Sequence, residues 1–302
     1  MEYIEDEIAR LKKEKNAVIL AHYYVPDEVQ EIADFIGDSF YLSKKANETN
    51  AGTIVFAGVR FMGESAKILN PDKTVLMPDI TADCPMAHMI TPGQIEAMRQ
   101  KYDDLAVVCY INSTAEIKTY CDVCVTSSNA VKIIRKLPQK NIYFVPDKNL
   151  GYYVGTQVPE KNVICNDGYC PRHNAIDPEY VKKCQHDHPN ALFLAHPECP
   201  KEVLAMADYI GSTSGIIQYA TESPEREFII GTENGVMYEL STRNPDKKFY
   251  PAMEYQYCIN MKKVTLEKVR NCLRDGSGEI HVPDDVRCKS LQALERMLEL
   301  AQ

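Results

Sequence analysis

The 302-residue sequence lacks any long hydrophobic run, which limits where the protein can act. No stretch of about 18 consecutive apolar residues occurs, so a membrane-spanning helix is not expected. Residues 1–16 have the pattern of a charged amphipathic helix and lack the apolar core of a signal peptide. The sequence therefore predicts a cytoplasmic protein that works without a membrane.

Nucleotide-binding motifs and flexible linkers are also missing. Neither G-x-G-x-x-G nor G-x-x-x-x-G-K-[ST] is present, so nothing predicts a dinucleotide or ATP site. No low-complexity segment interrupts the chain, which indicates that any domains are joined by short linkers and are tightly docked.

Positive charge is scarce relative to negative charge. The 34 lysines and arginines against 43 aspartates and glutamates give a net charge of −9, which argues against nucleic acid as a partner. A small anionic substrate stays possible if helix N-termini and histidines supply a local site.

Cysteine, in contrast, is abundant, with 11 residues. The number is odd, the spacings are wide and no secretion signal is visible, so a disulfide scaffold is not expected. Most of these cysteines should be inert buried thiols, whereas a few could bind a metal.

A repeat of about 87 residues is visible in the spacing of apolar runs and polar residues. Three apolar runs end at His22, Tyr110 and His196, which are 88 and 86 residues apart. Each is followed 17 residues later by a hydroxyl residue in a small polar turn, and these residues are Ser39, Ser127 and Thr213. A cysteine ends a later loop of each copy, at Cys84, Cys170 and Cys258, with spacings of 86 and 88 residues.

Short strand patterns alternate with helix patterns inside every copy, which is typical of parallel sheets covered by helices. We expect an α/β fold with three similar three-layer αβα domains around a pseudo-threefold axis. The expected domains are residues 1–103, 104–189 and 190–275, and the tail, residues 276–302, should form one strand and a helix that return to the first domain. Since ligands bind beyond the carboxyl ends of parallel strands, the three polar run ends should face one central site.

The three cysteines in register are candidate metal ligands. Three thiolates without an obvious fourth ligand suit a [4Fe–4S] cluster with one open iron, which can act as a Lewis acid. The C-x-x-C pair Cys121 and Cys124 occupies an apolar segment and is interpreted as structural. The same interpretation applies to the cysteines without counterparts in register, which are Cys109, Cys165, Cys184, Cys199, Cys272 and Cys288.

Hydroxyl, imidazole and other polar side chains complete the candidate site. Ser39, Ser127 and Thr213 should cap helices, contact an anion, or do both. His22 and His196 are candidate donors or acids, and equivalent positions two residues beyond the strand ends hold a mixed set that could move protons or orient a substrate, Tyr24, Asn112 and Glu198. The other histidines are expected to be surface or local structural residues, namely His88, His173, His186, His188 and His281.

Several motifs together resemble one family. The segments ILAHYY, EIADFIGDS, FMGESAKILNPDK, YINSTAEIK, TSSNA, PDKNLG, HPECP and IGSTSG, with the three separated cysteines, are similar to quinolinate synthases from about residue 4 to residue 300. Tyr23 stands where many relatives have asparagine, and a C-terminal C-x-x-C-x-x-C run found in some relatives is absent.

The resemblance implies a condensing and dehydrating transferase of NAD biosynthesis. It implies condensation of iminosuccinate with dihydroxyacetone phosphate to quinolinate, phosphate and water, and a functional link to an enzyme that produces iminosuccinate. It also implies a [4Fe–4S] cluster on Cys84, Cys170 and Cys258, with Tyr24, Glu198 and His22 in proton transfer. Substrate-binding positions of the family correspond to His22, Ser39, Tyr110, Ile111, Asn112, Ser127, His196, Pro197, Glu198 and Thr213.

Two alternatives stay open at this point. A hydro-lyase could use the same cluster on another hydroxy acid. A non-catalytic iron–sulfur sensor, or a protein with structural zinc, could also carry three cysteines in register.

Overall fold

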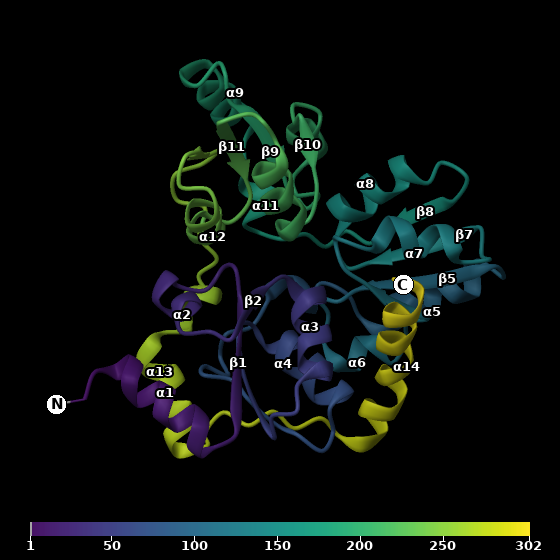
Figure 1. Ribbon diagram of the computed structural model, residues 1–302. Coiled ribbons are helices and arrows are strands. Elements are labelled where there is room, and N and C mark those ends of the chain that lie inside the picture. Colours follow the sequence, from purple (N-terminus) through teal and green to yellow (C-terminus); the bar gives the residue numbers. More distant parts are fainter. Residues whose placement is uncertain (1) are drawn as a thin grey trace.

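Three parallel four-stranded sheets form the framework of the molecule (Figure 1). This computed structural model describes residues 2–302. The strand orders are β2-β1-β3-β4, β6-β5-β7-β8 and β10-β9-β11-β12, so each sheet repeats the same topology. The predicted α/β fold with three similar domains is thereby confirmed.

Each sheet is built from four consecutive strands of the chain. The first contains β1 (Ala17–His22), β2 (Phe35–Gly37), β3 (Thr53–Ala57) and β4 (Thr74–Leu76). The second contains β5 (Leu105–Tyr110), β6 (Val123–Val125), β7 (Asn141–Val145) and β8 (Asn162–Cys165). The third contains β9 (Leu192–Ala195), β10 (Tyr209–Ile210), β11 (Glu227–Gly231) and β12 (Lys248–Pro251).

Helices connect the strands and cover the sheets. The first repeat carries α1 (Ile4–Glu14), α2 (Asp27–Glu31), α3 (Ser39–Glu48), α4 (Arg60–Leu69), η1 (Pro85–His88) and α5 (Pro92–Lys101). The second carries α6 (Ala115–Lys118), α7 (Ala130–Lys136), α8 (Lys148–Gln157), η2 (His173–Ala175) and α9 (Pro178–Asp187). The third carries α10 (Lys201–Leu204), α11 (Thr213–Glu222), α12 (Val236–Arg243), η3 (Met261–Lys263) and α13 (Leu266–Asp275), and α14 (Asp284–Leu300) follows.

The apolar runs become strands because both of their faces are buried. All six residues of β5 are buried, and so are all residues of β1 except Ala17. Continuous rather than alternating hydrophobicity is expected of parallel strands covered by helices on both sides. Both strands are interior strands of their sheets, and their last residues, His22 and Tyr110, line one common cavity.

The tail differs from its predicted strand and helix. The helix is present as α14, but the strand is reduced to a single antiparallel bridge between Glu279 and Leu76. Gly278, with a positive φ of 79°, directly precedes this bridge, and Pro283 beyond it cannot donate a ladder hydrogen bond. The α14 helix packs against α4 of the first repeat and α6 and α7 of the second. The predicted domain limits stay a prediction.

None of the helices described between residues 2 and 302 is long and apolar enough to cross a membrane.

Candidate functional site

One central cavity lies where the strand ends of the three repeats meet. Most of the predicted site residues line it, and these are His22, Tyr24, Ser39, Cys84, Tyr110, Asn112, Ser127, Cys170, His196, Glu198, Thr213 and Cys258. Ile111 and Pro197 connect lining residues along the chain and do not themselves form part of the wall described here. The spacing of the sequence repeat therefore corresponds to convergence in space.

The three cysteines enter the cavity in the same local structure. Cys84, Cys170 and Cys258 each follow a loop and precede a short 3-10 turn, η1, η2 or η3. Burial, together with the neighbouring Cys258 and Glu198, raises the pKa of the Cys84 thiol to about 12. Burial likewise raises the pKa of Cys170 well above its ordinary value. A bound cation would favour the deprotonated form instead, since a metal displaces the proton of a thiol and binds the thiolate.

Buried acidic side chains accept hydrogen bonds from the backbone amides of two of the three cysteines. The Asp147 carboxylate accepts from the Cys170 amide at 3.1 Å, and the Glu233 carboxylate accepts from the Cys258 amide at 2.8 Å. Both acids are fully buried and lie two residues beyond the ends of β7 and β11. The equivalent position of the first repeat is Val59, and there the Cys84 amide donates to its neighbour Asp83 instead, at 2.8 Å.

Two buried histidines have their tautomers fixed by the backbone. His22 Nδ1 accepts from the Tyr24 amide at 3.2 Å, and His196 Nδ1 accepts from the Glu198 amide at 3.3 Å. Burial lowers the pKa of both imidazoles to about 3, so they are neutral near pH 7. With Nδ1 as the acceptor, each neutral ring carries its proton on Nε2. His196 Nε2 lies 3.2 Å from the Ser127 hydroxyl, and both rings can donate into the cavity.

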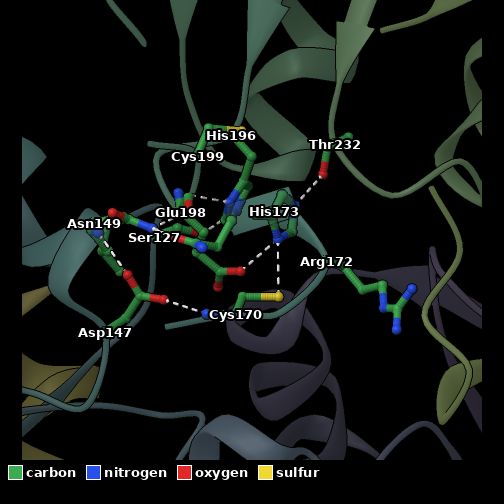
Figure 2. A network of polar contacts seen from close by, with 12 residues as sticks. Ser127, Asp147, Asn149, Cys170, Arg172, His173, His196, Glu198, Cys199 and Thr232 are labelled. Carbon is green, nitrogen blue, oxygen red and sulfur yellow. Dashed lines mark hydrogen bonds and ion pairs between the residues drawn. The ribbon is translucent and has the colours of Figure 1, made fainter. Parts of the chain in front are cut away.

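His173 corrects one sequence-based expectation, because it is neither a surface residue nor a local structural one. It is buried in the cavity wall and stacks on His196, with 4.7 Å between the ring centroids. Figure 2 shows one side of its ring directed at both Glu198 and Cys170, with Nδ1 2.7 Å from the Glu198 carboxylate and 3.2 Å from the Cys170 sulfur. These three side chains can together approach one metal ion.

A chain of hydrogen bonds connects Tyr24 to the opposite wall. The Tyr24 hydroxyl lies 2.8 Å from the Thr232 hydroxyl, which lies 2.8 Å from His173 Nε2. His173 Nδ1 contacts Glu198, and the other Glu198 oxygen accepts from Tyr110 at 2.6 Å. This relay joins side chains from all three repeats and can pass a proton across the cavity.

The charge state of Glu198 follows from its partners. Burial by itself would raise its pKa, but the His173 imidazole at 2.7 Å and the Tyr110 hydroxyl at 2.6 Å hold the pKa well below the usual range. Glu198 is therefore a carboxylate in the relay. Burial also raises the pKa of Tyr24 and of Tyr110, so both phenols keep their protons.

The hydroxyl residues lie at helix starts, but neighbouring residues do the capping. Asp38 caps α3 by accepting from the Tyr41 amide, and Ser212 caps α11 by accepting from the Gly215 amide. Ser39 and Thr213 are the first residues of these helices, whereas Ser127 precedes α7 by three residues. The two helix N-termini consequently face the cavity with hydroxyls and free amides available to an anion.

Sequence reasoning missed several residues of this site. His173 lies three residues after Cys170, where the other copies have Ala87 and Met261, so a search for repeated residue types passes over it. Thr232 and Arg172 likewise lack chemically similar counterparts, and Arg172 lines the cavity. Asp147 and Glu233 could have been found from the repeat. Both lie two residues beyond the end of a strand, β7 or β11, so two of the three copies carry an acid at this position.

Buried polar cavities at the strand ends of parallel sheets are the places where α/β proteins bind small molecules. Fold and site together therefore define an α/β protein with one central small-molecule site shared by three repeats.

Comparisons with known proteins are consistent across the whole chain. Residues 6–299 match the family model described as quinolinate synthetase A protein. A quinolinate synthase of Fusobacterium nucleatum is 58% identical over 298 residues, which cover 99% of each chain. Similar proteins with the same name from Caldicellulosiruptor saccharolyticus and Clostridioides difficile are 54% and 50% identical, and cover 99% and 97% of their own lengths. The chain belongs to the quinolinate synthase family, which confirms the resemblance seen in its motifs.

Proposed function

We propose that this protein is a quinolinate synthase that condenses iminosuccinate with dihydroxyacetone phosphate in NAD biosynthesis. The products are quinolinate, phosphate and two waters. The observation that carries the proposal is the convergence of three equivalent cysteines, two neutral histidines and a carboxylate on one cavity, in a chain that belongs to this family.

The donor set suits a [4Fe–4S] cluster held by Cys84, Cys170 and Cys258. Three soft sulfur donors, one from each repeat, line the same cavity, and their loops are anchored by amide–carboxylate hydrogen bonds. When bound, a cluster with three protein ligands supplies a Lewis-acidic iron for polarising a substrate oxygen or nitrogen.

Anionic groups of the substrates find several neutral donors and one cation in the cavity. The Nε2 protons of His22 and His196 and the N-termini of α3 and α11 can bind carboxylate or phosphate oxygens. Arg172 adds a guanidinium to the lining, which can offset part of the substrates' charge. These contacts would hold the two reactants together and raise their effective concentration.

Proton transfer is assigned to the relay that starts at Tyr24. Enolisation, cyclisation and loss of water each move protons between carbon, nitrogen and oxygen. The Tyr24 hydroxyl can give a proton to a leaving hydroxyl, and Thr232 and His173 can replace it along the relay. Glu198 stays ionised and stabilises a protonated His173 while the proton is in transit.

Iminosuccinate is an imine and hydrolyses in water, so its supply favours a nearby producer. We therefore also propose a functional link to an enzyme that makes iminosuccinate in the same compartment, the cytoplasm.

Serine substitution of the cysteines tests the cluster directly. We expect Cys84→Ser, Cys170→Ser and Cys258→Ser each to lose most bound iron and at least ~100-fold of the activity, because each removes one of three ligands. Cys288→Ser is the matched control, since Cys288 is exposed and lies away from the cavity. Iron and sulfide analysis of anaerobically purified protein gives the measurement, and full iron content in any of the three variants would contradict the assignment.

A single metal ion is the second candidate, favoured by the close approach of Cys170, His173 and Glu198. A sulfur, a nitrogen and an oxygen donor suit zinc with one open position. The two hypotheses predict different effects of the same variants. A single ion would stay bound in Cys84→Ser and Cys258→Ser but would be lost in His173→Ala. Metal analysis of these three proteins distinguishes a colourless zinc protein from an iron–sulfur protein.

A further inference from the structure

Three thiols outside the central cavity lie together in the second repeat. Cys109 on β5 and Cys124 on β6 are direct register partners, Cys121 precedes Cys124 by three residues, and both neighbouring thiols influence the charge of the Cys109 sulfur. We refer to Cys109, Cys121 and Cys124 as the thiol cluster. Its position is distinct from that of the three cysteines in the central cavity.

The surroundings of Cys109 favour a thiolate over a thiol. Burial opposes a charge on this sulfur, but the two neighbouring thiols, the Ser113 hydroxyl and a nearby ammonium favour it. Together they hold the pKa of Cys109 well below its ordinary value. The ammonium belongs to Lys118, which is fully buried and donates to the Ser113 carbonyl. A buried lysine without a carboxylate partner is costly, and a thiolate beside it offsets that cost.

Cys121 gives the thiol cluster a route to solvent. It is partly buried and lines a surface pocket formed with the end of α14, whereas Cys109 and Cys124 are fully buried. The pocket wall carries three acidic side chains against one arginine, Asp122, Glu295, Glu299 and Arg296. A small cationic reagent should therefore reach Cys121 more readily than an anionic one.

We propose that Cys121 and Cys109 form a thiol–disulfide exchange site that reacts with small cationic disulfides and controls the position of Tyr110. The Cys109 thiolate first takes the proton of Cys121, and the Cys121 sulfur then attacks the external disulfide, which forms a mixed disulfide and releases one small thiolate. Cys109 then attacks the Cys121 sulfur, which forms the Cys109–Cys121 bond and releases the second small thiol. The two protein sulfurs are oxidised and the external disulfide is reduced to two small thiols. The one proton shared by Cys109 and Cys121 leaves on one small thiol, and the other small thiol leaves as a thiolate that takes its proton from water.

The connection to the central cavity runs through the backbone. Tyr110 directly follows Cys109, and its hydroxyl donates to Glu198 at 2.6 Å. Asn112 also lines the cavity, and the Ser113 hydroxyl donates to the Tyr110 carbonyl at 3.0 Å. A bond from Cys109 to Cys121 must shift the Cys109 sulfur, and a displacement of about 1 Å at a cavity residue can lower a rate by one to two orders of magnitude.

Disulfide mapping of the anaerobic holoprotein tests the proposal with cystamine, a cationic disulfide. After treatment, acid quenching and alkylation with N-ethylmaleimide, peptide mass spectrometry should find the Cys109–Cys121 link. Cys109→Ser should stop at the mixed disulfide on Cys121, and Cys121→Ser should leave Cys109 free. Cys124→Ser is the matched buried control and should still form the link. Thermal unfolding of each variant shows whether it is folded.

Activity supplies the second measurement. Cystamine should lower the rate of the wild-type protein on the order of tenfold, with iron content unchanged, and dithiothreitol should restore it. The Cys109→Ser protein should not respond. Oxidised glutathione, which is anionic, should react more slowly than cystamine.

Three results would overturn the proposal. The first is free Cys109 and Cys121 in a sample where the exposed Cys288 has reacted. The second is a Cys109–Cys124 link in place of the expected one. The third is a complete Cys109–Cys121 link with an unchanged rate. Mapping does not require turnover, so its failure is distinguishable from failure of the proposed function.

Discussion

The Tyr24 hydroxyl links the first repeat directly to the third. It lies 2.7 Å from Thr213 and 2.8 Å from Thr232, both in the third repeat, while its own backbone belongs to the first. The Lys262 ammonium donates to the Tyr24 carbonyl at 2.8 Å, which adds another link from the third repeat. Tyr24 thus serves the relay and the junction between repeats at once.

Replacing Tyr24 by phenylalanine separates these two roles. We expect Tyr24→Phe to lower kcat by about 10²- to 10⁴-fold, because the relay loses its terminal acid. The free energy of unfolding should fall by only about 1–3 kcal/mol, since two threonine hydroxyls lose a partner. Steady-state kinetics and urea unfolding provide the two values.

Tyr255→Phe is the matched control, because Tyr255 is 76% exposed and should change neither quantity. Wild-type kcat in Tyr24→Phe with full iron content would remove Tyr24 from the chemistry.

Single residues also show what the sequence could and could not predict. Cys84, Cys170 and Cys258 were visible because the same residue type recurs in every copy. His173 was not, because its function depends on contacts with Glu198 and Cys170, and Glu198 comes from a different repeat. Spacing along the chain identifies positions that are equivalent in the three repeats. It does not identify hydrogen bonds between residues at non-equivalent positions, which only the structure shows.

Among the elements, the link between α13 and α14 has the most demanding backbone. Gly276 and Gly278 both have positive φ values, 66° and 79°. Gly278 also lies against the Met77 backbone, whose amide donates to the Gly278 carbonyl at 2.8 Å. Together with the Glu279–Leu76 bridge, this contact holds the tail along β4 and Met77, at a glycine where a side chain would collide with the Met77 backbone.

Alanine substitution at the two glycines gives a matched pair. Gly276→Ala should cost about 1–2 kcal/mol, because only the left-handed conformation opposes it and no atom lies in the way of a Cβ. Gly278→Ala should cost clearly more, because its Cβ would also collide with the Met77 carbonyl. Equal losses in urea unfolding would show that the contact with Met77 yields without cost.

Elements were predicted well where both faces are buried and less well at their ends. The runs that became β1 and β5 are continuously apolar, a strong signal of parallel strands. The helix starts were less certain, since Ser39 and Thr213 follow the capping residue rather than capping. Where two neighbouring residues could both cap a helix, as Asp38 and Ser39 or Ser212 and Thr213 could, the sequence does not determine which of them accepts the hydrogen bond.

The molecule as a whole groups three repeats around one cavity, and Cys84, Cys170 and Cys258 line that cavity. The spacings of 86 and 88 residues predicted this arrangement, because equivalent strands of similar domains place equivalent residues around an axis. Bridging by α14, which packs on α4, α6 and α7, had no counterpart in the repeat and so could not be derived from it.

Removal of the cluster proposed for Cys84, Cys170 and Cys258 should loosen all three repeats together. If the group proposed for Cys84, Cys170 and Cys258 binds only the folded protein, its loss lowers the free energy of unfolding by the contribution of binding. That contribution is about 2.7 kcal/mol for each factor of 100 by which the free ligand concentration exceeds Kd. We expect a lower Tm after chelation and faster hydrogen exchange in the loops of all three cysteines. Exchange that rises at Cys170 alone would instead support the single ion bound with His173 and Glu198.

The similarity of the three repeats has a consequence for how a ligand is oriented in the central cavity. In a perfectly threefold cavity, a small ligand would have three equally favourable poses, each turned by a third of a circle. Here the equivalent walls present a phenol at Tyr24, an amide at Asn112 and a carboxylate at Glu198. The divergence of the copies therefore breaks the rotational degeneracy, and an asymmetric molecule is read in a single direction.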